Sequence, residues 1–177
     1  MKDLSVGVSF AWQIAAMETG LAKYQYIEKE QILMGIFSLE KIFISPEFQF
    51  RINPSDYKEL KKEYDAIENI LQKFKINSTK LRRKLRAKSG QGNFRRSEKV
   101  VHRSEECKKF FARADELAEN SDNITSLHLL TAIVENSEGV IGEVLKDLNI
   151  DPIKLLDQTL LYTGIIQKPD KDDSYFI

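Results

Sequence analysis

The sequence has few of the residues on which most catalytic and metal sites depend. Its 177 residues include one cysteine, Cys107, and two histidines, His102 and His128. One cysteine excludes an internal disulfide, and these three side chains are too far apart in the chain to predict a zinc site or a cysteine–histidine pair. A lone cysteine also fits a reducing compartment, so we expect a cytoplasmic protein.

Glycine is also scarce, and no arrangement of it predicts phosphate binding. The eight glycines never form G-x-x-x-x-G-K-[ST] or G-x-G-x-x-G, the patterns of nucleotide-binding loops. Paired acids such as Glu105–Glu106 and Asp172–Asp173 lie in polar, surface-like stretches with nothing nearby to raise a pKa. The sequence therefore predicts neither a cofactor nor a metal, and a protein that is not an enzyme.

Long apolar runs are missing as well. None reaches the roughly 18 residues that a membrane span requires, and the N-terminus lacks the apolar core of a signal peptide. The apolar content is nevertheless 42%, which is enough for a core. We expect a soluble chain that forms one compact domain or two small ones.

Charge is balanced overall but segregated along the chain. Residues 80–103 hold ten Lys or Arg against the single acid Glu98, although the formal net charge is zero. This stretch has two readings: a nucleic-acid-binding patch, or a solvated helix face and a linker. Phe94 is the one aromatic among the charges and no nucleic-acid motif accompanies them, which favours the second reading. Residues 104–177 are acidic and could dock the basic stretch.

Two short stretches that lie 97 positions apart resemble each other, residues 26–36 and residues 123–133. Each places an isoleucine before a polar run and then closely spaced aliphatic residues, the pattern of a short buried helix. The same offset carries Phe10, Ile14, Met17 and Leu21 onto Cys107, Phe111, Ala114 and Ala118. Steps of three and four residues in both series predict an amphipathic helix, with Ser9 as the first N-cap.

Farther along the chain the offset between the copies is 74 residues. It pairs Ile70, Leu71, Phe74, Ile76 and Leu81 with Val144, Leu145, Leu148, Ile150 and Leu155, and it pairs two good N-caps, Asn77 and Asp151. The first copy therefore contains an insertion of 97 − 74 = 23 residues. The sequence predicts an all-α fold, a pseudo-twofold tandem repeat of two four-helix motifs.

The expected organisation is a first repeat at residues 1–88 with an insertion at about 38–66, a basic linker at 89–103 that is flexible by composition, a second repeat at 104–164, and a C-terminal linker at 165–177. In the insertion, Phe48, Phe50 and Ile52 alternate with polar residues, which predicts an extended segment. A seam of apolar residues at steps of three and four then indicates that the third helix is extended at its N-terminal end. The seam consists of Tyr57, Leu60, Tyr64, Ile67, Leu71 and Phe74. Its partner would be the Phe48–Phe50 segment, a separate protein or a second copy of the chain.

Cys107, His128 and Trp12 are interpreted as structural residues. Cys107 lies on the predicted apolar stripe, and a reactive thiolate requires an exposed, electropositive setting instead. His128 stands among leucines, where a lone histidine is usually a hydrogen-bonded interior group. Trp12 lies off the stripe, so we expect it to be partly buried, at the core edge or against the second copy.

The doubled pattern resembles the amino-terminal domain of the Clp family of AAA+ unfoldases. That domain repeats a short helix written as aromatic-Ile-x-x-Glu-His-Leu-Leu-x-x-Leu, followed by x-x-Val-Leu-x-x-Leu-x-Ile-Asp. The matching stretches here are residues 123–133 with 144–151, and residues 26–33 with 70–77. The resemblance implies a pseudo-twofold helical domain that receives adaptor proteins or unfolded substrates for an ATPase ring, in cis or in trans.

In some family members the glutamate of each Glu-His pair helps to bind phosphorylated arginine. Only Glu30 matches that glutamate here, because Leu127 stands at the equivalent position of the second copy and Gln31 replaces the first histidine. Our expected function is a non-catalytic substrate- or adaptor-binding domain, with Glu30, Phe48, Phe50, Tyr57 and Tyr64 as partner-binding residues. The alternatives are a nucleic-acid-binding module that uses residues 80–103 and a stand-alone Clp accessory protein. The ATPase modules of the family are absent from these 177 residues.

Overall fold

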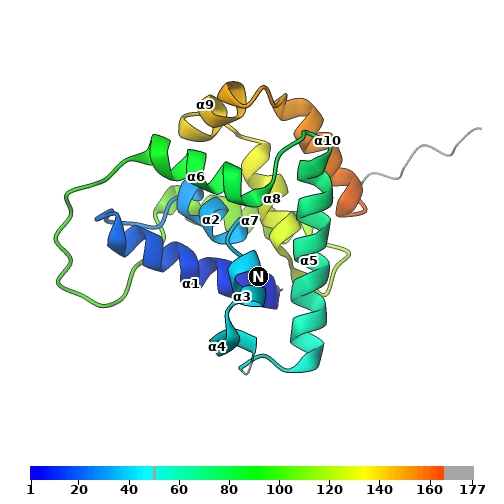
Figure 1. Cartoon of the computed structure of the whole chain (residues 1–177), viewed down its shortest axis with the longest axis horizontal. Helices are drawn as coiled ribbons and strands as arrows, with labels where there is room; N and C mark the ends of the chain where they lie inside the picture. The colour runs from blue at the N-terminus through cyan, green and yellow to red at the C-terminus, as the bar shows by residue number, and fades with distance from the viewer. Residues whose placement is uncertain (50, 166–177) are drawn as a thin grey trace, which may run out of the picture.

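The computed structural model describes residues 1–49 and 51–165, most of which are helical (Figure 1). The first half contains α1 (Val6–Leu21), α2 (Lys29–Ile36), α3 (Glu40–Ile44), α4 (Pro46–Gln49), α5 (Pro54–Gln72) and α6 (Ser78–Ser89). The second half contains α7 (Glu105–Leu117), α8 (Ser126–Val134), α9 (Val140–Asp147) and α10 (Pro152–Tyr162). Two short strands, β1 (Asp3–Leu4) and β2 (Asn123–Ile124), pair in parallel. The predicted all-α fold is confirmed.

The two halves are joined by reciprocal main-chain hydrogen bonds. The Ser5 N–H donates to the Ile124 carbonyl at 2.9 Å, and the Ser104 N–H donates to the Ile27 carbonyl at 3.1 Å. Ser5 and Ser104 are the N-caps of α1 and α7, whereas Ile27 and Ile124 precede α2 and α8. The start of the first helix in each half is therefore fixed by the residue that leads into the second helix of the other half.

The register predicted for α1 is wrong. The N-cap is Ser5, whose Oγ accepts from the Val8 N–H at 3.2 Å, and not Ser9. On the predicted stripe, Met17 is 63% exposed and Leu21 is 74% exposed. The buried face consists instead of small residues, namely Gly7, Val8, Ala11, Ala15 and Thr19. Relative to α7, where Cys107 and Ala114 are buried, the offset of this face is 99 residues and not 97.

Close packing between α1 and α2 explains this choice of face. A methyl group at Gly35 of α2 would collide with the carbonyl oxygen of Ala11, so the two backbones approach too closely for large side chains. Phe10 and Ile14 lie at the margin of the core and are only partly buried. The size of the available space, and not hydrophobicity alone, selects the inner face of α1.

The predicted second helices are confirmed, and both begin with a capping box. In α2 the Glu28 N–H donates to the Gln31 Oε1 at 3.0 Å. In α8 the Thr125 N–H donates to the His128 Nδ1, also at 3.0 Å. His128 is 3% exposed, as expected of an interior histidine. Glutamine and histidine thus perform the same capping task 97 residues apart.

The 74-residue offset is reproduced in local detail around α6 and α10. Asn77 and Asp151 cap these helices through their side chains. Just before each cap, Lys75 and Asn149 both adopt a φ of 56°, and the following Ile76 and Ile150 are buried. The two halves therefore carry the same series of turns and caps at this point of the chain.

The insertion lengthens α5 at its N-terminal end, as predicted. Its counterpart α9 has 8 residues, whereas α5 has 19. The extended segment is wrong for Phe48, which lies in the short helix α4, because Pro46 occupies the first position of that helix, where proline is tolerated. Phe50 lies outside the described residues. Among the described side chains, Phe43 of α3 packs its ring on Tyr57 and Tyr64 in the outer part of α5.

The basic stretch, residues 80–103, contacts the rest of the protein through salt bridges and hydrogen bonds. Lys84 and Lys88 of α6 form salt bridges with Asp147 of α9 at 3.6 and 3.4 Å, as the acidic second half predicted. In the linker, Arg96 donates to the carbonyls of Tyr24 and Gln25 at 2.8 and 2.9 Å. Residues 89–103, expected to be a linker that is flexible by composition, thus contact the first half of the chain at Arg96.

Arg103 joins α1 to α7. Its guanidinium lies 4.1 Å from the ring centroid of Trp12 and 4.3 Å from that of Phe111, whose rings also contact each other. Trp12 is partly buried against the second half, and both readings proposed for it are confirmed. A stacked guanidinium of this kind stabilises packing while its edge remains polar.

Glu63 of the inserted part of α5 is buried between the starts of two helices. It is 7% exposed, and its Oε2 accepts from the Ser126 N–H, at the N-terminus of α8, at 2.8 Å. Gly7, in the first turn of α1, leaves the space that the carboxylate occupies. The positive end of a helix favours an anion, so Glu63 fastens α5 to α8 and α1.

We predict that Gly7→Ala destabilises the protein by about 1–3 kcal/mol, because the new methyl group would collide with the Glu63 carboxylate. The matched control is Gly20→Ala in the same helix, where nothing lies within 4 Å. That control should leave stability unchanged or raise it by up to about 1 kcal/mol. Urea unfolding followed by circular dichroism measures both. Equal effects of the two substitutions would contradict this role of Gly7.

A second prediction concerns pH. Burial, with a smaller contribution from Lys2, lowers the pKa of His128. Between this lowered value and about 6.5 the unfolded chain binds a proton that the folded protein does not, so stability falls as the pH falls below about 6.5. His128→Gln should weaken this loss while keeping an acceptor for the Thr125 N–H, as Gln31 does in α2. Unfolding curves at pH 7.5, 6.5 and 5.5 test it, and identical pH slopes in both proteins would refute it.

Candidate functional site

No group of three or more His, Cys, Asp or Glu within residues 1–49 and 51–165 could hold a metal ion. Cys107 is 1% exposed, and burial raises the pKa of its thiol to about 12, so it is not a nucleophile at neutral pH. No helix in the same ranges is long and apolar enough to cross a membrane.

Aromatic side chains gather where the outer half of α5 meets α3. The ring of Phe43 lies 5.4 Å from that of Tyr57 in an edge-on arrangement and 5.3 Å from that of Tyr64. Burial, reinforced by Glu68, Glu40 and Asp65, raises the pKa of Tyr64 to about 12. Tyr57 remains 37% exposed at the edge of this cluster. The two tyrosines predicted as contact residues thus lie together, one mainly inside and one at the surface.

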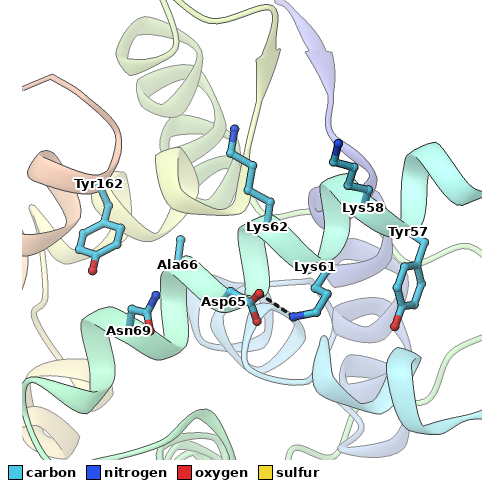
Figure 2. A pocket seen from close by; sticks show the side chains of 8 residues that line it. All are labelled: Tyr57, Lys58, Lys61, Lys62, Asp65, Ala66, Asn69 and Tyr162. Carbon is cyan, nitrogen blue, oxygen red and sulfur yellow. Dashed lines mark hydrogen bonds and ion pairs between the residues drawn. The ribbon is translucent and has the colours of Figure 1, made fainter.

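A hollow of about 500 Å³ begins at Tyr57 and follows the solvent-facing side of α5 to Tyr162 of α10. Figure 2 shows the two tyrosines at its opposite ends. Lys58, Lys61, Lys62, Asp65, Ala66 and Asn69 line it between them. Because the insertion supplies the N-terminal part of α5, most of this hollow has no counterpart beside the shorter α9.

A second hollow, of about 490 Å³, adjoins the first. It lies between α5, the segment before α8 and the end of α10. Lys62, Ala66 and Tyr162 line both hollows, so the two are neighbours on the surface of α5. We call the combined surface the α5 groove. Its second part is lined by Glu59, Ser121, Asp122, Leu127 and Thr163, among others.

The α5 groove carries charge of both signs. Lys61 pairs with Asp65 at 2.6 Å (Figure 2). Lys58 and Lys62 are exposed and form no salt bridge with any described residue. Glu59 and Asp122, also exposed, lie in the second hollow. The groove therefore offers exposed lysines and acids beside one another, with Tyr57 in its first part and Tyr162 lining both parts.

Glu30, the predicted polar anchor, lies elsewhere. It is on the first turn of α2, where burial raises its pKa and Lys29 and Glu28 are its charged neighbours. Burial, with a smaller contribution from the charge of Glu30, raises the pKa of Tyr24 in the turn before α2. None of these residues lines the α5 groove. The structure therefore brings Tyr57 and Tyr64 together but leaves Glu30 apart from them. Phe48 lies on α4, and Phe50 is outside the described residues.

Sequence reasoning missed the lysines of the groove and Tyr162. Lys58, Lys61 and Lys62 occupy the polar side of the helix whose apolar seam was recognised, and their three- and four-residue spacing was the available signal. No local pattern links Tyr162 to α5, because these residues meet only through the packing of α10 on the long helix. The basic residues emphasised in the sequence, such as Arg86 with Glu18, mostly contact the protein itself.

We predict that the aromatic cluster stabilises the outer part of α5. In a double-mutant cycle, Phe43→Leu and Tyr64→Leu should show a coupling energy of about 0.5–1.5 kcal/mol, as expected of a tilted ring pair at 5.3 Å. The control cycle pairs Phe43→Leu with Tyr162→Leu, at the opposite end of α5, and should be additive within about 0.5 kcal/mol. Urea denaturation supplies the values. Coupling in the control as strong as in the test pair would show that the effect is not local.

Comparison with known proteins agrees with this architecture. The family described as the Clp repeat (R) N-terminal domain matches residues 104–176. The N-terminal domain of Hsp104 from Candida albicans superposes with a TM-score of 0.65 at 8% sequence identity, covering 94% of this chain and 95% of that chain. No curated protein matches the chain in sequence. Residues 104–176 thus match the Clp repeat family, and the chain as a whole has the same fold as the Hsp104 N-terminal domain.

Proposed function

We propose that this chain is a non-catalytic domain that binds protein substrates or adaptors for a Clp-type ATP-dependent unfoldase. The observation that supports the proposal most is the combination of a Clp repeat at residues 104–176 with the Hsp104 N-terminal-domain fold over 94% of the chain. The ATPase ring would be supplied in cis or in trans, in the cytoplasm.

The α5 groove is the surface on which we place this binding. A protein-binding site needs exposed apolar and aromatic area beside polar groups that fix the orientation of a partner. Tyr57 and Tyr162 provide the exposed rings, Ala66 provides apolar lining beside Tyr162, and Leu127 contributes to the lining of the second hollow. The groove is open along α5, so it suits an extended segment better than a compact ligand.

The other predicted contact residues have different roles in this proposal; they are Tyr64, Phe48, Phe50 and Glu30. Tyr64 acts from beneath, because it supports the exposed Tyr57 through Phe43. Phe48 and Phe50 belong to the same insertion and are proposed as an extension of the aromatic surface. Glu30, on α2, would form a separate polar contact for a larger partner.

We predict that the chain binds a reduced, carboxymethylated globular protein that cannot refold, measured by fluorescence anisotropy of the labelled probe. Tyr57→Ala combined with Tyr162→Ala should weaken binding about tenfold or more, since each removes an exposed aromatic contact. Phe48→Ala combined with Phe50→Ala tests the proposed extension in the same assay.

The matched control is Lys80→Ala with Arg83→Ala, which alters a similar hollow on the outer face of α6. It should leave the affinity within about twofold of the parent protein. Circular dichroism confirms that each variant is folded. Equal affinity of the Tyr57/Tyr162 variant and the parent would remove the groove from the proposal, and failure of the parent to bind any unfolded probe would oppose the function itself.

A further inference from the structure

Arg82 of α6 is a buried cation without a matching acid. It is 8% exposed, although arginine is rarely buried in proteins unless it is paired. Its Nη1 donates to the Ser38 Oγ at 3.3 Å, which is a long hydrogen bond, and its buried Nε has no partner in the described part of the chain. None of the salt bridges that α6 forms with described residues involves Arg82. A buried guanidinium with unused donors indicates a place for an anion from outside the chain.

Two further cations lie beside Arg82. Arg86 is one turn farther along α6, on the same side of the helix. Lys41 is in α3, and its N–H donates to the carbonyl of Ser38, the residue whose hydroxyl Arg82 contacts. Burial lowers the pKa of Lys41, and the charges of Arg82 and Arg86 lower it further. The three cations are therefore close enough to repel one another, and Lys41 and Arg86 remain exposed to solvent.

The acids near these cations have partners of their own. Glu18 of α1 accepts from the Nε of Arg86, at 3.1 Å, and also from its Nη2. Glu40 of α3 accepts from the Thr79 Oγ1 at 3.2 Å. With Arg86 and Glu18 paired, the other charges that act on this place are those of Lys41, Arg82, Arg83 and Glu40. Three cations against one carboxylate leave an excess of two positive charges.

We propose that Arg82, Lys41 and Arg86 form a site for a phosphate dianion, either free or at the end of a phosphate monoester. A phosphate monoester carries about −1.5 to −2 charges at pH 7, which matches the local excess. A guanidinium can donate two parallel hydrogen bonds to phosphate oxygens, and a lysine adds a point charge. A terminal phosphate can also reach a side chain that is only 8% exposed, whereas the phosphates of a nucleic-acid backbone are flanked by sugars on both sides.

Titration of the full chain with inorganic phosphate at constant ionic strength tests the site. Nuclear magnetic resonance should show saturable shifts of the Arg82 Nε–H signal and of the Ser38 and Lys41 amide signals, with a dissociation constant of about 1 mM or below. Sulfate, another dianion, should compete, whereas acetate, with one charge, should bind about tenfold more weakly. The amide signal of Tyr162, which lines the α5 groove, is the internal reference and should not move. Absence of saturation up to about 20 mM phosphate overturns the proposal.

Lys41→Gln tests the contacts without disturbing Arg82, because Lys41 bonds to Ser38 through its main chain. The substitution should raise the dissociation constant for phosphate about fivefold or more. The matched control is Lys80→Gln, an exposed lysine on the outer face of α6, which should leave the constant within about twofold of the parent value. Circular dichroism confirms that both variants are folded. Equal losses in the two variants overturn the site, since general attraction to a positive surface would then explain the binding.

Further probes identify the source of the phosphate. A phosphoserine peptide that binds more tightly than inorganic phosphate, while its unphosphorylated form does not bind, supports the site and assigns it to phosphorylated proteins. Weaker binding of the phosphopeptide supports the site and assigns it to the free ion. A single-stranded oligonucleotide without a terminal phosphate that shifts the Arg82 signal as strongly as phosphate overturns the dianion site in favour of nucleic acid.

The site is independent of the function proposed above. None of its three cations lines either hollow of the α5 groove. Lys41→Gln should therefore leave the affinity for the unfolded-protein probe within about twofold of the parent value. Phosphate binding without binding of that probe supports the anion site alone, and binding of the probe without saturable phosphate shifts overturns the anion site alone.

Discussion

The structure depends on a reciprocal exchange between its halves. Ser5 bonds to Ile124 and Ser104 bonds to Ile27, so each half fixes the helix start of the other. A single four-helix motif is too small to bury its apolar surfaces, whereas two halves fastened in this way share one continuous core. Glu63 adds a buried contact from the inserted part of α5 to the N-terminus of α8. The dependence of each half on the other makes independent motion of the halves costly, and it gives the long helix a rigid base.

That rigid base allows the insertion to create a surface. The extra turns of α5 extend past the repeat core, with Leu60 buried on one side and Lys58 and Lys62 exposed on the other. Phe43 shields Tyr64 and supports Tyr57, so the aromatic edge is held in place and not left to collapse. α10 completes the groove by placing Tyr162 beside Ala66 (Figure 2). A binding surface on rigid helices loses less conformational entropy when a partner docks than one built on loops.

Much of this organisation could be predicted, because it is encoded locally. The second helices, the caps at Asn77 and Asp151 and the longer third helix all follow from short patterns of apolar and capping residues. The face of α1 could not be predicted, since Met17 and Leu21 fit an apolar stripe better than Ala11 and Ala15 do. Of the candidate site, Tyr57 and Tyr64 were found from the seam. The lysines and Tyr162 were not, because their common surface joins residues about one hundred positions apart.

Short patterns within the sequence were enough to predict the positions of most helix starts and the structural roles of Cys107 and His128, because caps and periodic apolar residues act within a few positions of the chain. The buried face of α1, the ring that packs on α5 and the lysines without a salt bridge to any described residue became known from the folded structure alone. These features depend on the available space and on contacts between residues far apart in the sequence. The Ala11 carbonyl lies too close to Gly35 for any side chain at that position. Lys84 forms a salt bridge with Asp147, whereas Lys58 forms none with any described residue.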